Sequence, residues 1–82
     1  MDPDLSRTLW RCRRGMRELD MLLHAYAEAH YRRMSALDRA VFERFLDAQD
    51  ADIYAWFTGR QAPPDAALGE LVGRILAARP AR

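Results

Sequence analysis

The sequence of 82 residues contains one cysteine, no lysine and no long apolar run. With Cys12 alone, the chain can form neither an internal disulfide nor a cluster of cysteine ligands around a metal ion. No window approaches the ~18 consecutive apolar residues that a membrane-spanning helix needs. The first twenty residues carry several charges and no continuous apolar core, so we expect no signal peptide, no membrane insertion and a cytoplasmic location.

The chain also lacks a strong net charge. Its 13 basic residues, all of them arginine, face 12 acidic residues, which leaves a formal charge of +1 at pH 7. No global field therefore draws the protein to nucleic acid or to a lipid surface. The exclusive use of arginine is compatible with bidentate or stacked contacts, and equally with a compositional bias of the source.

No stretch alternates with period two over the length of a strand, and turn signals fall only between helical stretches. We therefore predict an all-α fold: a compact single-domain bundle of five short helices over residues 1–82, with a core from about 5 to 78 and short frayed termini. The first helix should end near Arg14 and the second should run from about Arg17 to about Tyr31. Ser35, Asp50 and Asp65 are predicted to cap the last three helices, and Gly59 to end the fourth.

Apolar residues at helical spacing predict which positions are buried. On the second helix the predicted stripe is Leu19, Leu22, Leu23, Tyr26, Ala27 and His30. On the third it is Leu37, Ala40, Val41, Phe45 and Ala48, widened by Phe42 and Leu46. Cys12, Trp56 and Phe57 should also be core or core-edge residues, and Gly69 and Gly73 should allow close helix packing.

The stretch 13–20 combines three arginines, one glycine and two carboxylates at the predicted joint between the first two helices. Gly15 is able to take a positive φ there and turn the chain. The arginines before it suit a helix C-terminus, and the carboxylates after it suit a helix N-terminus. This structural role and a role in binding a partner are both compatible with the stretch.

Catalytic and metal-binding patterns are weak in this sequence. Glu18 and Asp20 are two positions apart and do not face each other on a helix, which argues against an acid–base pair. His24 and His30 are six apart and lie on different faces, with no third ligand in view. We therefore predict no enzyme activity and no metal site.

A basic cluster precedes and enters the same stretch; it consists of Arg7, Arg11, Arg13, Arg14 and Arg17, with Trp10 among them. Such a cluster can bind phosphates, as in a small helical DNA-binding regulator. It can also be a protein-binding hot spot, since Arg and Trp are enriched at such sites, or simply a solvated face. The acidic neighbours and the lack of a recognition-helix pattern favour protein binding over DNA binding.

Three motifs together resemble one known family. Arg14-Gly15-Met16-Arg17-Glu18 resembles the Arg-Gly-x-x-Glu signature of the SdhE-type succinate dehydrogenase assembly factors, which help flavinylation. Asp50-x-Asp52-x-x-x-Trp56 and Pro64-Asp65-x-x-Leu68 resemble the same family at its usual separations, so the similarity runs from about Leu9 to Leu76. Ala51 stands where family members often carry proline, which we expect to loosen a helix start.

This resemblance implies a non-enzymatic assembly factor. Such proteins bind the flavoprotein subunit of succinate dehydrogenase, or of the related fumarate reductase, and promote covalent attachment of FAD to a histidine of that subunit. The chain itself is expected to be a monomer that binds neither FAD nor nucleic acid tightly. The signature marks Arg14, Gly15 and Glu18; the further candidate contacts are Arg17, Asp20, Arg13, Trp10, Asp50 and Asp52.

Overall fold

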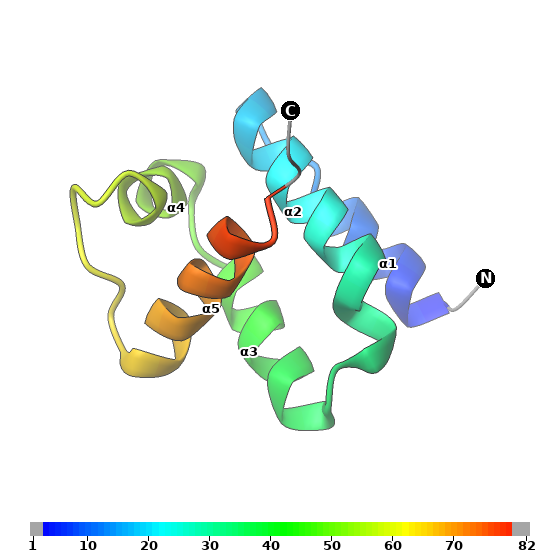
Figure 1. Ribbon diagram of the computed structural model, residues 1–82. Helices are drawn as coiled ribbons and strands as arrows, with labels where there is room; N and C mark the ends of the chain where they lie inside the picture. Colours follow the sequence, from blue (N-terminus) through cyan, green and yellow to red (C-terminus); the bar gives the residue numbers. More distant parts are fainter. Residues whose placement is uncertain (1–2, 80–82) are drawn as a thin grey trace.

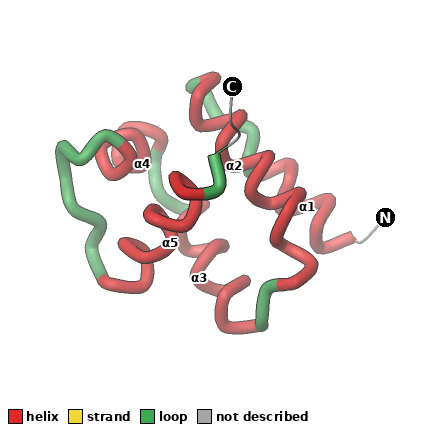
Figure 2. The backbone as a smooth tube through the Cα atoms, in the orientation of Figure 1, coloured by secondary structure: helices red, strands yellow, loops and turns green. Residues whose placement is uncertain are grey.

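The computed structural model describes residues 3–79, which contain five α-helices, one 3-10 turn and no strand. This part of the chain confirms the predicted all-α bundle (Figures 1 and 2). The elements are α1 (Pro3–Arg11), α2 (Arg17–His30), η1 (Tyr31–Arg33), α3 (Ala36–Leu46), α4 (Asp50–Phe57) and α5 (Ala66–Ala77). None of these helices combines the length and the apolar composition that crossing a membrane requires.

Helix α2 is the longest and contacts α1, α4 and α5, while α3 packs on α5. In Figure 1, α1 lies alongside α2, and α5 lies between that pair and α4. The core between them is closed by side chains from every helix; its largest fully buried members are Phe42, Phe45, Leu19, Leu23, Ile53 and Ile75. Because the core is this small, the stability of the fold also depends on helix capping and on side-chain hydrogen bonds between helices.

Several helix ends form as their sequences predict. The Ser35 hydroxyl accepts a hydrogen bond from the Asp38 N–H (3.1 Å), and the Asp65 carboxylate accepts one from the Leu68 N–H (3.0 Å). Gly59 has φ +76° and follows Thr58, the C-cap of α4. The N–H of the next residue, Arg60, reaches back to the carbonyl of Ala55 at 2.9 Å, which completes a Schellman-type end.

Other boundaries differ from the prediction. Helix α1 begins at Pro3, where a proline is well tolerated, and ends at Arg11 instead of near Arg14. The fourth helix begins at Asp50 itself, so Asp50 is not its cap; Gln49 takes that position without a side-chain bond. The predicted frayed ends include residues 1–2 and 80–82, which lie outside the described residues.

The predicted buried stripe of the third helix is partly wrong. Phe42, Phe45 and Leu46 are buried, whereas Leu37 is 74% exposed and Ala40 is exposed. The two large aromatic rings set the rotation of α3, because their burial outweighs that of the smaller side chains on the neighbouring face.

The expectation of close packing at the two glycines of α5 is also wrong. A Cβ atom on Gly69 or Gly73 would meet no atom within 4 Å. Helix α5 instead packs through its larger residues Leu68, Leu71, Val72 and Ile75.

Candidate protein-binding site

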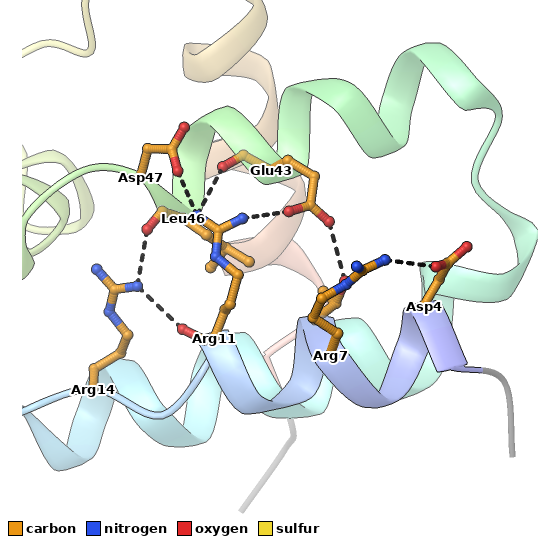
Figure 3. A network of polar contacts seen from close by, with 8 residues as sticks. Asp4, Arg7, Arg11, Arg14, Glu43, Leu46 and Asp47 are labelled. Atoms are coloured by element: carbon orange, nitrogen blue, oxygen red, sulfur yellow. Dashed lines mark hydrogen bonds and ion pairs between the residues drawn. The ribbon is translucent and has the colours of Figure 1, made fainter.

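The motif stretch forms the joint between α1 and α2, and Arg14 ties it to the joint between α3 and α4. The Arg14 guanidinium group donates from Nη1 to the Leu46 carbonyl (3.1 Å) and from Nη2 to the Ala48 carbonyl (2.6 Å). It also donates to the Arg11 carbonyl at the end of α1 (3.2 Å). Figure 3 shows the Arg14 side chain reaching both Arg11 and Leu46. Only 11% of this side chain is exposed, so Arg14 is engaged inside the fold.

Asp50 completes this clasp from the first turn of α4. Its Oδ1 accepts from Arg14 Nε at 2.7 Å, and its Oδ2 accepts from the Gly15 N–H at 2.8 Å. The hydrogen bond from Arg14, together with that from the Gly15 N–H, holds the pKa of the Asp50 carboxyl below its usual range despite its partial burial. Asp20 joins the clasp by accepting from the Arg14 N–H at 3.2 Å.

Gly15 does not have the conformation that its place at a helix joint suggested. Among the described residues, Gly59 alone has a positive φ. A Cβ atom on Gly15 would instead lie 3.2 Å from Oδ2 of Asp50. The glycine therefore matters here for space beside a carboxylate, and not for a left-handed turn.

A second polar network joins α1 to α3 (Figure 3). Arg11 forms ion pairs with Glu43 and Asp47, and the buried Thr8 hydroxyl donates to Glu43 Oε2 at 3.1 Å. At the exposed end of α1, Arg7 pairs with Asp4 at 2.7 Å. Arg7, Arg11 and Arg14 thus have carboxylate partners within the chain, which reduces the positive charge that the basic cluster offers to phosphates.

The remaining motif residues point to solvent. Trp10 is 69% exposed, and the Arg13 guanidinium group lies over its ring, 4.9 Å from the centroid. Arg17 and Glu18, in the first turn of α2, are exposed. We call Trp10, Arg13, Gly15, Arg17 and Glu18 the docking strip. Asp20 is half-buried and joins Arg14 and Asp50 in the inward clasp, while Asp52 is exposed on α4 and belongs to neither group.

Two residues of α2, His24 and Met21, were not among the candidate contacts predicted from the sequence. His24 lines a shallow groove between α1 and α2 together with Trp10, Arg13 and residues of α1. Met21, on the same side of α2 by its spacing of three from His24, is 65% exposed. The sequence did contain a signal for Met21: it is a large apolar residue that lies off the predicted buried stripe of α2, one turn from Glu18.

Three side chains of residue types that often take part in catalysis, Cys12, His24 and His30, are engaged within the described part of the fold. Cys12 is fully buried, as predicted, and burial raises the pKa of its thiol to about 12. His24 pairs with Glu28 at 3.5 Å, and His30 packs against the ring of Tyr26 with centroids 4.6 Å apart. In residues 3–79, no group of three or more His, Cys, Asp or Glu side chains is placed to hold a metal ion.

Comparison with known proteins decides the family. The model of the family described as "Flavinator of succinate dehydrogenase" matches residues 6–79. The chain belongs to this family.

Named relatives agree with this assignment. The chain is 45% identical over 72 residues to the FAD assembly factor SdhE of Methylococcus capsulatus, covering 88% of this chain and 87% of that protein. It is 40% identical over 75 residues to the FAD assembly factor SdhE of Pseudomonas aeruginosa (92% and 89%), and 36% identical over 72 residues to that of Shewanella oneidensis (88% and 88%). The family resemblance predicted from the three motifs is confirmed, and the DNA-binding alternative finds no support in these matches.

Proposed function

We propose that this chain is a non-enzymatic assembly factor that binds the flavoprotein subunit of succinate dehydrogenase, or of fumarate reductase, and promotes covalent attachment of FAD. The family match over residues 6–79 carries this proposal. The structure adds an exposed strip at the signature and a fully buried thiol with a raised pKa at Cys12. Bond formation accordingly belongs to the client and its flavin.

The docking strip has the chemistry of a protein-binding surface. Trp and Arg are enriched where interfaces hold most of their binding energy. Stacking of Arg13 on Trp10 restrains two large side chains before the partner arrives, which lowers the entropy lost on binding. Arg17 and Glu18 add two exposed side chains of opposite charge from the first turn of α2, so the strip can discriminate between partners by charge complementarity.

The proposed mechanism is selection of one client conformation. A factor that binds one state of the flavoprotein better than the others shifts the population toward that state. The selected state holds the attacking histidine close to the flavin methyl carbon, which lowers the entropic part of the barrier. The factor acts as a monomer in the cytoplasm, in the manner of a chaperone, and has no tight affinity of its own for FAD or nucleic acid.

In-gel flavin fluorescence of the client subunit, in cells that lack their own factor, tests this function. The wild-type chain should restore the fluorescent band, because covalent flavin survives denaturing electrophoresis. Glu18→Arg should lose most of the signal while the isolated protein stays folded, with a Tm only a few degrees below wild type, because Glu18 is exposed and the reversed charge opposes only the dipole at the start of α2.

The matched control is Glu70→Arg, the same charge reversal at an exposed position of α5. It should restore flavinylation fully. Failure of the wild-type chain to restore any covalent flavin would refute the proposed function. Equal activity of the two variants would remove Glu18 from the strip.

A further inference from the structure

We propose that Asp50 is a positioning residue: its carboxylate holds Gly15 in place within the docking strip, and the same carboxylate is what excludes a side chain at position 15. The consequence for docking rests on the proposed function. The contacts of Asp50 with Arg14 and Gly15, called the clamp below, do not depend on it.

Both oxygens of Asp50 are used, and by neighbouring residues of the motif. Oδ1 accepts from Arg14 Nε and Oδ2 from the Gly15 N–H, at 2.7 and 2.8 Å. The clamp therefore joins Asp50 to two residues that precede it by 36 and 35 positions in the sequence. Asp50 is itself anchored, because Ile53 and Trp56, one and two turns further along α4, are buried in the core. A rigid helix thus fixes where the Gly15 backbone lies.

The exclusion of a side chain at position 15 follows from the same contact. The Gly15 backbone is outside the left-handed region, so its conformation alone does not demand glycine. A Cβ atom would lie 3.2 Å from Oδ2 of Asp50, tighter than an ordinary van der Waals contact. The carboxylate is unable to withdraw without lengthening its bonds to Arg14 and Gly15. An alanine at position 15 therefore shifts the carboxylate or the Gly15 backbone by a few tenths of an ångström, at the expense of these two bonds.

Amide chemistry makes the demand on Asp50 specific. An asparagine has one acceptor oxygen and one donating NH₂ group, where an aspartate has two acceptor oxygens. Asp50→Asn can satisfy Arg14 or Gly15, but not both. The charged Arg14 guanidinium is the stronger donor and should keep the oxygen, which leaves the Gly15 N–H without an acceptor. A purely space-filling role would tolerate this change, because asparagine has nearly the same size and shape as aspartate.

Asp65 supplies a matched control elsewhere in the fold. Its carboxylate also accepts from an arginine, Arg44, at 2.8 Å and from a backbone N–H, that of Leu68, at 3.0 Å. Asp65 is the N-cap of α5, and neither of these two partners belongs to the stretch 13–20. Asp50→Ala and Asp65→Ala therefore remove the same kinds of bond. Only Asp50→Ala removes the bond to the Gly15 N–H in the docking strip.

The first test needs no client: amide hydrogen exchange of Gly15, followed by NMR. Exchange should accelerate by at least about tenfold in Asp50→Ala and in Asp50→Asn, since the N–H loses its acceptor, and should stay at the wild-type rate in Asp65→Ala. Unchanged exchange in both Asp50 variants would overturn the clamp, whatever the chain's function.

The second test measures the Kd of the purified flavoprotein subunit for each variant. Asp50→Ala should weaken binding by about tenfold or more, and Asp65→Ala by less than about twofold at a similar loss of thermal stability. Equal weakening by both would reduce Asp50 to a structural residue and overturn the positioning role. No binding by the wild-type chain would overturn the proposed function, while the exchange result would still decide the clamp.

A double-mutant cycle tests the exclusion. Gly15→Ala should weaken client binding by about tenfold when Asp50 is present, and by less than about twofold in the Asp50→Ala background, where the carboxylate no longer meets the new Cβ. The same fold-change in both backgrounds would show that the client itself, and not Asp50, requires glycine at position 15.

Discussion

Arg14→Lys is the most informative single change for the fold, because it keeps the positive charge and removes the planar guanidinium group with its several donors. The guanidinium group donates four hydrogen bonds in different directions: to Asp50, to the carbonyls of Leu46 and Ala48, and to that of Arg11. A lysine ammonium group donates from one atom at the end of a flexible stem and is unable to reach this set together.

The expected cost follows from the number of bonds lost. Hydrogen bonds that involve a charged group contribute roughly 1.5–3 kcal/mol each, and the contributions of neighbouring bonds do not add. With Arg14 only 11% exposed, water replaces the lost donors poorly. We therefore expect a loss of about 2–4 kcal/mol. A chain of this length has a total stability of roughly 4–12 kcal/mol, so the change removes a large fraction of it.

A thermal melt followed by circular dichroism measures this effect. In a domain of this size each kcal/mol shifts Tm by roughly 4–8 °C, so Arg14→Lys should lower Tm by at least about 8 °C. The control is Arg13→Ala, which removes an exposed arginine whose stacking on Trp10 is worth less than about 1 kcal/mol. Equal Tm values for the two variants would refute the argument that Arg14 holds the α1–α2 joint against the α3–α4 joint.

Three further predictions follow from buried or paired groups. Trp56→Ala should cost roughly 3–5 kcal/mol, because the ring is 8% exposed and packs 5.7 Å from Phe45; a melt within about a degree of wild type would contradict its core position. Cys12 should resist thiol reagents in the native protein at pH 8, since burial raises its pKa to about 12, and Cys12→Ala should retain flavinylation; rapid labelling of the folded chain would contradict this. The lowered pKa of Asp50 means that its contribution to stability is complete above about pH 4 and is lost as pH falls through the depressed folded value. Acid unfolding of Asp50→Ala should therefore depend less steeply on pH than that of wild type, and identical slopes would count against the Arg14–Asp50 pair.

Sequence alone predicted those features whose cause is local. The caps at Ser35 and Asp65 and the turn at Gly59 each depend on residues within five positions, and all three form as predicted. The rotation of α3 was harder, because apolar residues lie on two of its faces. Spacing alone gives Leu37 the same weight as Phe45, and only packing against the other helices decides which is buried.

Asp50 shows the same limit at the candidate site. A residue that precedes an apolar helix was assigned as its cap, which is the commonest local role for aspartate. Its carboxylate instead reaches Arg14 and Gly15 at the opposite joint. No pattern within one helix encodes a bond between residues 36 positions apart, so this role follows only from how the α1–α2 joint lies against the start of α4.

The motif itself illustrates why adjacent signature residues need different experiments. Arg14 and Glu18 belong to one five-residue signature, yet one side chain is almost fully buried and the other is exposed. Gly15 lies between these cases, because any side chain there meets Asp50 before it meets a partner. A bulky substitution such as Gly15→Arg therefore perturbs the clamp and the docking strip at once, and loss of flavinylation in that variant does not assign a contact. Charge reversal at Glu18 leaves the clamp intact, so of the two changes it is the one whose effect on flavinylation reports the contact with the client.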